Sequence, residues 1–301
     1  MKLIKILCIC LCFVSCKDDG ALEDLSVNAP ESIILSPEDF ALVKIRAAQG
    51  DAKDQYRVGV CYIKGHGVPR DELQAVTWLT KAAKQGYIDA QAELAVLAYQ
   101  RYERDCDGFS HLSEVVRDRR LKDLSEKNKP VVQDLTKAAE QQNAHALFFL
   151  GHYYSNEKFI PRDSKKAHEF YTMSAEQGYI LAQYIVANNY YYGRGVLKDP
   201  QKAAYWLTKA AKQGHVEAQY YLGKWHHRDE TVKNPKKSVY WFTKAAEQGY
   251  PDAEFYLGYF YYHGINVSKD RAKAKEWISK ANKSGYPFAK KFWDDNELWK
   301  Y

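Results

Sequence analysis

The chain has 301 residues, 46% of them hydrophobic, and it contains 24 Tyr and 7 Trp beside only 2 Met. Its formal net charge of +6 comes from 44 basic and 38 acidic residues spread along the whole chain, a balance too mild and too mixed to indicate a nucleic-acid-binding protein. Because tyrosine is favoured where a ring is buried and its hydroxyl stays in water, the many tyrosines indicate half-exposed surfaces.

The N-terminal residues have the pattern of a processing signal. Lys2 and Lys5 precede a short apolar run, residues 6–14, and Ser15-Cys16 forms a cleavage site. The apolar run is too short to span a bilayer. We therefore expect residues 1–15 to be a signal peptide and residues 16–36 to be a flexible tether.

Residues 13–16, Phe13-Val14-Ser15-Cys16, resemble the bacterial lipobox, in which the cysteine is acylated and becomes the new first residue. Phe13 departs from the usual Leu of the first motif position. The resemblance implies an envelope lipoprotein anchored through Cys16, in the outer membrane facing the periplasm or exposed on the cell surface. A simple cleaved signal and a cytosolic start remain the alternatives. Lys17-Asp18-Asp19 resembles a sorting signal to the outer face, or is a solvated part of the tether.

The cysteines do not form a disulfide framework. Three of the six lie in the expected signal peptide, and Cys16 is the expected lipidation site. Only Cys61 and Cys106 remain in the body, where they form one bridge in an oxidising periplasm or stay as two inert thiols.

From Pro37 onward the sequence repeats. The octapeptide at residues 79–86, LTKAAKQG, returns unchanged at residues 207–214, and the glycines that close the units lie 35 or 36 residues apart. Between Gly86 and Gly178 lie 92 residues, which is two units plus 20, and a unit closing at Gln142 supplies the missing boundary. The period therefore predicts six units over residues 51–285, with the extra residues inserted at about 101–130.

Each unit has the pattern of a helical hairpin. In the first helix, apolar residues recur at intervals of three and four residues around a small residue. Because this small residue recurs in every unit, we expect the backbone of the partner helix to approach closely there. A glycine turn follows, as in Gly65-His66-Gly67, and Asp71 or Asp199 is placed to cap the second helix. The second helix is expected to bury an aromatic residue at one register, occupied by Trp78, Phe170, Trp206, Trp241 and Trp277.

This pattern resembles the Sel-one-like repeat family, relatives of the tetratricopeptide repeats. Its signature of Leu-Gly-x-x-Tyr, Gly-x-Gly-Val and Lys-Ala-x-x-Trp-x-x-Lys-Ala-Ala-x-x-Gly recurs through the units. The resemblance implies an all-α, right-handed solenoid of helical hairpins, with capping helices at residues 37–50 and 286–301. Units two, three and five depart from the signature at Asp134, at Ser155-Asn156-Glu157 and at His226.

One stripe of the first helices is predicted to face away from the core. In a solenoid the first helices line the concave side, and residues two before, one after and five after the small position lie opposite the core on a helical wheel. We expect this stripe to bind a protein, because rigid aromatic rings dominate interface energies. Neighbouring units burying some of these rings as core is the alternative. The candidate residues are Phe149, Ile185, Tyr192, Tyr221, Lys224, Arg228, Tyr256 and Tyr259.

The remaining polar features do not indicate chemistry. His226 and His227 are adjacent and point some 100° apart on a helix, so they cannot share a metal ion. We find no nucleophile elbow and no phosphate-binding loop, so we expect no enzyme activity, no cofactor and no metal. The insertion at residues 101–130 is charge-dense, and is either a solvated helical extension or an arm that contacts a partner.

Two classes of function follow. The first is a protein-binding scaffold of the bacterial cell envelope. Within this class, the family resemblance implies either an immunity protein against a secreted phospholipase effector of a type VI secretion system, or a general envelope adaptor or assembly factor. The second is an enzyme or binder of beta-lactams or of the cell wall. The family members that suggest it have hairpins stapled by disulfides, which two body cysteines cannot supply.

We predict that Cys16 attaches the chain to the membrane and does not contribute to folding. Cys16→Ser should give a soluble protein with unchanged helical circular dichroism, because the residue precedes the repeats. The anchor assignment is wrong if this variant stays entirely in the membrane fraction after a high-salt wash.

Overall fold

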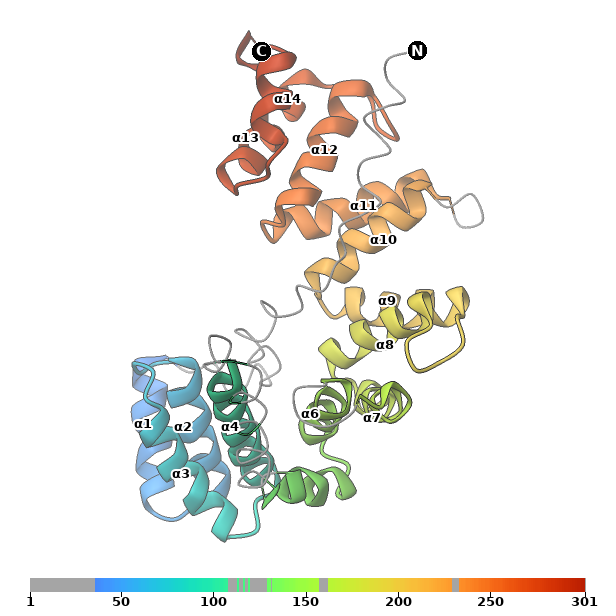
Figure 1. The fold of residues 1–301 in the computed structure, drawn as a ribbon. Coiled ribbons are helices and arrows are strands. Elements are labelled where there is room, and N and C mark those ends of the chain that lie inside the picture. Colours follow the sequence, from blue (N-terminus) through green and yellow to red (C-terminus); the bar gives the residue numbers. More distant parts are fainter. Residues whose placement is uncertain are drawn as a thin grey trace. The chain divides into compact units, whose positions relative to one another are not determined.

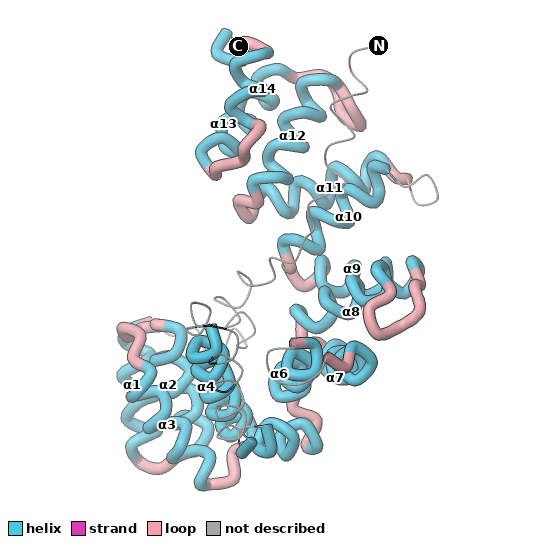
Figure 2. The backbone as a smooth tube through the Cα atoms, viewed as in Figure 1, coloured by secondary structure: helices cyan, strands magenta, loops and turns pink. Residues whose placement is uncertain are grey.

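The computed structural model describes residues 36–107, 132–156, 162–228 and 233–300, together with residues 113, 116, 119, 129 and 130 (Figures 1 and 2). All regular elements within these ranges are helices, which confirms the predicted all-α class. None of these helices combines the length and the apolar composition needed to cross a membrane. Cys16, the tether and most of the insertion lie outside the described residues.

The helices alternate along the chain as first and second members of hairpins. They are α1 (Pro37–Ala48), α2 (Ala52–Lys64), α3 (Glu72–Lys84), α4 (Ile88–Asp107), α6 (Ala144–Ser155), α7 (Ser164–Glu176), α8 (Ile180–Tyr192), α9 (Pro200–Lys212), α10 (Val216–Arg228), α11 (Pro235–Glu247), α12 (Pro251–His263), α13 (Arg271–Lys283), α14 (Ala289–Asp295) and the short 3₁₀-helix η4 (Leu298–Lys300). Residues 132–140 are mostly helical too.

Two compact units, residues 1–90 and residues 91–301, make up the chain, and each is described by itself. In the first unit α1 packs on α2, and α2 pairs with α3. In the second unit the hairpins are α6–α7, α8–α9, α10–α11 and α12–α13, and each second helix also packs on the first helix of the next hairpin. This alternation is that of an all-α helical repeat solenoid.

The helix ends follow the predicted rules. Asp71 and Asp199 cap α3 and α9, each accepting a hydrogen bond from the backbone N–H three residues on, and Asp163, Asn234 and Asp270 cap the other second helices in the same way. Gln142 stands where other units close with glycine and adopts a left-handed backbone with φ 60°. The backbone at Gln142 thus has the conformation of the glycines that close other units.

The small position of the first helix receives a side chain of the second helix. A Cβ atom built on Gly223 would lie 2.8 Å from two ring carbons of Phe242, and one on Gly59 would lie 2.7 Å from Cγ of Leu79. Gly151 and Gly258 meet Tyr171 and Ile278 in the same way. The prediction of a close approach by the partner backbone was therefore wrong in detail, because the space of the missing side chain is filled mainly by a large apolar residue.

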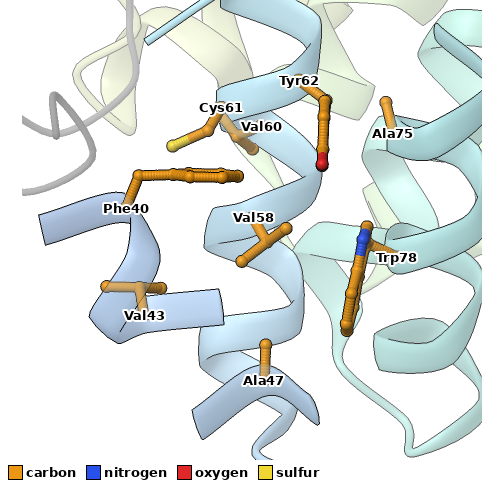
Figure 3. Close-up of a cluster of buried hydrophobic side chains, with 9 residues drawn as sticks. All are labelled: Phe40, Val43, Ala47, Val58, Val60, Cys61, Tyr62, Ala75 and Trp78. Carbon is orange, nitrogen blue, oxygen red and sulfur yellow. The ribbon is translucent and has the colours of Figure 1, made fainter. Parts of the chain in front are cut away.

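The core of the first unit illustrates this packing (Figure 3). Phe40 and Val43 of α1 reach across to Val58 on α2, and Trp78 of α3 lies on the opposite side of that helix. Cys61 is fully buried in this cluster, and burial raises the pKa of its thiol to about 11. The side chain of Cys106 lies outside the described part of the chain.

A buried glutamine links successive hairpins. Gln219 of α10 donates its Nε2 to the carbonyl oxygen of Ala211 in the preceding helix, at 3.0 Å, and its Oε1 accepts from Nε2 of Gln248 at the end of its own hairpin, at 2.8 Å. Gln55 and Gln183 make the same two bonds, to Ala47 and Gln85 and to Ala175 and Gln213 respectively. Both halves of each buried amide are therefore satisfied.

Ring pairs join the hairpins beside these amides. One ring comes from the first helix, and its partner stands at the start of the next first helix, with centroids 4.5 to 5.2 Å apart. Tyr179 and Tyr250 occupy N-cap positions, but their side chains make no capping hydrogen bond. At these two helix ends the side chain contacts a neighbouring ring instead. The pairs are Tyr56–Tyr87, Phe148–Tyr179, Tyr184–His215, Tyr220–Tyr250 and Phe255–Tyr286.

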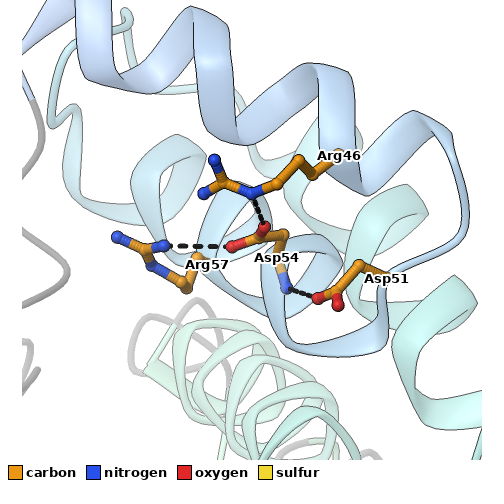
Figure 4. A network of polar contacts seen from close by, with 4 residues as sticks. All are labelled: Arg46, Asp51, Asp54 and Arg57. Atoms are coloured by element: carbon orange, nitrogen blue, oxygen red, sulfur yellow. Dashed lines mark hydrogen bonds and ion pairs between the residues drawn. The ribbon is translucent and has the colours of Figure 1, made fainter.

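The first junction, between α1 and α2, also carries a charged network (Figure 4). The Asp54 carboxylate on α2 accepts hydrogen bonds from Arg46 of α1 and from Arg57, and the Asp54 N–H donates to Asp51. Burial opposes ionisation of Asp54, but the two arginines outweigh it and hold the pKa of the carboxyl below its usual value. This contribution to stability is present above the ordinary pKa of Asp and is lost as the pH falls through the lowered value.

We predict that Glu254→Gln stabilises the fold. Glu254 of α12 occupies the position of the linking glutamines, is 4% exposed, and has a buried Oε2 without a hydrogen-bond partner. An amide there supplies the missing donor, so the free energy of unfolding should rise by about 1 to 3 kcal/mol in urea denaturation.

The matched control is the reverse change in the preceding hairpin. Gln219→Glu removes the donor to Ala211 and should lower the free energy of unfolding by a similar amount. Equal stabilities of Glu254→Gln and the wild type would show that the amide bonds contribute nothing to the junctions.

Candidate partner-binding surface

The first helices α8, α10 and α12 of the second unit bring most of the predicted binding residues together. We name the resulting surface the aromatic face. It combines exposed or half-buried rings with cationic side chains on three successive first helices. Its members are Tyr191, Tyr192, Tyr221, Lys224, Trp225, Arg228, Tyr256 and Tyr259.

Two cations of α10 lie against tyrosine rings. The ammonium of Lys224 is 5.2 Å from the ring centroid of Tyr220 and 5.5 Å from that of Tyr221. Arg228 is exposed and donates from Nη2 to the hydroxyl of Tyr256 on α12, at 3.3 Å. These contacts orient the cations beside the rings, so the face offers apolar area and positive charge together.

The end of α8 adds two exposed rings. Tyr191 and Tyr192 are 52% and 40% exposed, and the guanidinium of Arg194 lies 5.0 Å from the ring centroid of Tyr192. Tyr191 also meets Trp225 of α10 edge to face, at 5.9 Å. The helical-wheel argument missed Tyr191 and Trp225, although the run of three tyrosines at residues 190–192 was a signal that at least one ring must be exposed.

Of the residues predicted to face outward, Phe149 belongs to the core, and Tyr256 is half-buried and packs against it. Phe149 of α6 is fully buried, with its ring edge to face with those of Tyr99 and His145. The ring of Tyr256 stacks parallel on Phe242 of α11, with centroids 5.1 Å apart, and joins the cluster of buried residues around it. The prediction that they point away from the core was wrong, because helices of adjacent hairpins cover them.

The other predicted residues lie at intermediate depth. Ile185 and Tyr221 are half-buried, and the Tyr221 ring lies nearly parallel to that of Tyr184, with centroids 6.4 Å apart. Tyr259 is half-buried between His263, at 4.4 Å, and Phe292 of the C-terminal helix, at 5.8 Å. Because these side chains are half-buried, a partner gains modest area from each.

The charge of the face comes from arginine and lysine. Burial lowers the pKa of His215, His227 and His263 below the ordinary value, so these imidazoles are neutral at pH 7. Burial also raises the pKa of Asp252, whose Oδ1 accepts from the Tyr220 hydroxyl at 3.4 Å. The face is therefore positive over the neutral pH range.

The histidines of α10 have structural contacts. The His227 ring lies 4.8 Å from that of Phe260, and its Nδ1 is 3.4 Å from the side-chain amide of Asn266. Within the described ranges, no three His, Cys, Asp or Glu side chains are grouped closely enough to hold a metal ion.

The comparison with protein families identifies the repeat. The model of the Sel1 repeat matches residues 52–87, 144–179, 180–215, 216–250 and 251–286, which together make up more than half of the chain. Residues 88–143, which contain the insertion, fall outside these segments, so the sixth unit stays a prediction. The chain matches no curated protein.

Solved structures share the fold. A Sel1 repeat protein from Oxalobacter formigenes is 31% identical with a TM-score of 0.63, over 86% of this chain and 69% of the other. The protein c5321, a protective antigen present in uropathogenic Escherichia coli strains, is 29% identical with a TM-score of 0.52, and the match spans 83% of this chain and only 57% of that protein.

The immunity protein PA5088 from Pseudomonas aeruginosa matches at 16% identity and a TM-score of 0.43, over 84% of this chain and 87% of the other, a likeness too remote to bear on function. The five matched repeats and the 31% identical structure agree with the helical hairpins of the fold. The chain belongs to the Sel1 repeat family.

Proposed function

We propose that this chain is a scaffold that binds a partner protein on its aromatic face. Sel1 repeat proteins are protein-binding scaffolds, which supports the class of function. The observation that carries the proposal is the set of rings with cations beside them, the exposed Tyr191 and Tyr192 with Arg194 on one hairpin and the half-buried Tyr221 with Lys224 on the next.

The geometry suits recognition of a folded protein. Tyrosine and tryptophan lose little side-chain entropy on binding, and here helices joined at fixed junctions already hold the rings in place. Arginine and tyrosine are also the residue types that dominate measured interface energies. A partner with an apolar centre and acidic margins complements this face.

Attachment to the cell envelope is part of the proposal. The lipobox resemblance supports lipidation of Cys16, and residues 16–36 then tether the repeats to the membrane, where the outer membrane facing the periplasm is the expected site. Within this setting the partner is a secreted phospholipase effector, if the chain is an immunity protein, or a component of an envelope assembly. A neighbouring lipase or toxin gene favours the first, and a neighbouring assembly cluster the second.

We expect photocrosslinking to locate the partner on the aromatic face. A benzophenone amino acid at position 192 or 228 should crosslink one and the same envelope protein. The matched controls are positions 205 and 240, because Tyr205 and Tyr240 are 54% and 53% exposed but lie on the second helices α9 and α11.

The affinity for that purified protein gives the quantitative test. Tyr192→Ala combined with Arg228→Ala should weaken binding at least about tenfold and leave the melting temperature unchanged, because neither side chain is buried. Tyr205→Ala with Tyr240→Ala should leave affinity as it is. Crosslinks from positions 205 and 240 alone would place the partner on the second helices and refute the proposal.

A further inference from the structure

In the second unit the described residues at the ends of the first helices and the starts of the second helices adjoin from hairpin to hairpin. A Cβ atom on Gly195, in the turn of the α8–α9 hairpin, would lie 1.9 Å from the carbonyl oxygen of Ser164, which starts α7. Asn266, in the α12–α13 turn, is 3.4 Å from His227 at the end of α10. The contact between the rings of Tyr191 and Trp225 joins the α8–α9 hairpin to the α10–α11 hairpin. Consecutive turns therefore form one continuous edge.

This edge concentrates the positive charge of the chain. The described residues of the four turns, 155–156, 162–167, 192–203, 226–228, 233–238 and 263–275, contain 14 Lys and Arg against three Asp. Their net charge of +11 exceeds the +6 of the whole chain. The opposite helix ends, residues 172–183, 208–219, 243–254 and 279–290, contain six basic and five acidic residues. The excess of positive charge therefore lies on one edge of the repeats, which we name the turn edge.

The acidic residues of the turn edge do not cancel this charge. Asp163, Asp199 and Asp270 are N-caps whose Oδ1 atoms accept backbone hydrogen bonds from the second helices. The ion pairs of Asp199 and Asp270 with nearby lysines are exposed and long, at 3.8 and 3.9 Å. The exposed cations include Arg162, Lys165, Lys198, Lys236, Lys237 and Lys269.

An apolar side chain projects from the middle of the turn edge. Leu197, between α8 and α9, is 89% exposed, more than any other large hydrophobic residue among the described ones. It stands directly before Lys198 and three residues after Arg194, and Tyr191 and Tyr192 are exposed at the same end of α8. An apolar tip between cations and tyrosines is the composition that inserts at a membrane–water interface.

We propose that the turn edge binds the surface of an anionic lipid bilayer, with lysines against the phosphates and Leu197 between the headgroups. Among the described residues of these turns lysine outnumbers arginine by ten to four. Lysine suits attraction to a diffuse charged surface, whereas arginine suits paired contacts of fixed geometry. A nucleic acid would contact the lysines and arginines of the edge, but it would offer no apolar environment for Leu197. Tyr192 and Arg228 belong to both the turn edge and the aromatic face, so the two surfaces adjoin.

Vesicle binding tests this proposal. The full chain carrying Cys16→Ser is mixed with vesicles of phosphatidylcholine alone or with about 30% phosphatidylglycerol, near physiological salt, and the ratio of the two affinities is measured. The segment before Ser36 is the same in every variant, so its contribution cancels when the ratios are compared. The ratio should fall at least about thirtyfold in Lys198→Glu/Lys236→Glu/Lys237→Glu, since each cation near the surface contributes about fivefold.

The matched control reverses three exposed lysines at the opposite helix ends. Lys212→Glu/Lys244→Glu/Lys283→Glu makes the same change in net charge and should lower the ratio less than about threefold. Leu197→Ser should weaken binding to the anionic vesicles about threefold. Thermal melting of all variants checks that they are folded.

Three results would overturn the proposal. An equal loss in the two triple variants would mean that only net charge matters, and equal affinities of the parent protein for both vesicle types would mean that the edge does not bind anionic lipid. Binding to duplex DNA as tight as to anionic vesicles, at equal phosphate concentration and with Leu197→Ser without effect, would assign the edge to nucleic acid.

Discussion

The junction between one hairpin and the next is the constraint on which the rest of the structure depends. At three junctions a buried glutamine donates to the preceding hairpin and accepts from the end of its own, with a ring pair beside it. A side-chain amide has a donor and an acceptor, and a buried one is costly when either is unpaired. Sliding one hairpin along its neighbour by a residue breaks the bond to the preceding hairpin and leaves a buried amide donor unpaired, so the junction fixes the register.

The fixed register between adjacent hairpins brings side chains of separate helices together into one surface. The aromatic face uses side chains of α8, α10 and α12, and the contact between Arg228 and Tyr256 exists only because two hairpins keep a fixed offset. The turn edge depends on the same offset, because lysines of different turns form one charged strip only when the turns adjoin. A single packing rule thus supports two surfaces of different chemistry, one suited to a protein and the other to a lipid surface.

Much of the fold follows from local sequence. The caps Asp71 and Asp199, and the left-handed backbone at Gln142, depend on residues a few positions apart, and a repeated pattern makes them visible. The outward stripe was less predictable. A helical wheel centred on the small residue locates the core of one hairpin, but Phe149 and Tyr256 are covered by rings of adjacent hairpins, which the wheel does not contain. The turn edge was missed for a related reason. Its lysines and arginines are far apart in the sequence and come together only when the hairpins pack in order.

The central claim is that the two glutamines of a link act as one unit in holding a hairpin to the end of the preceding one, where Gln219 donates to Ala211 and Gln248 to Gly214. A double-mutant cycle on Gln219→Ala and Gln248→Ala, read from hydrogen exchange of the buried amides in α10 and α11, measures this coupling directly, because the two side chains are joined by a 2.8 Å hydrogen bond. The account predicts that the double variant loses about 1 kcal/mol less than the sum of the single losses. Strict additivity of the two losses would contradict it.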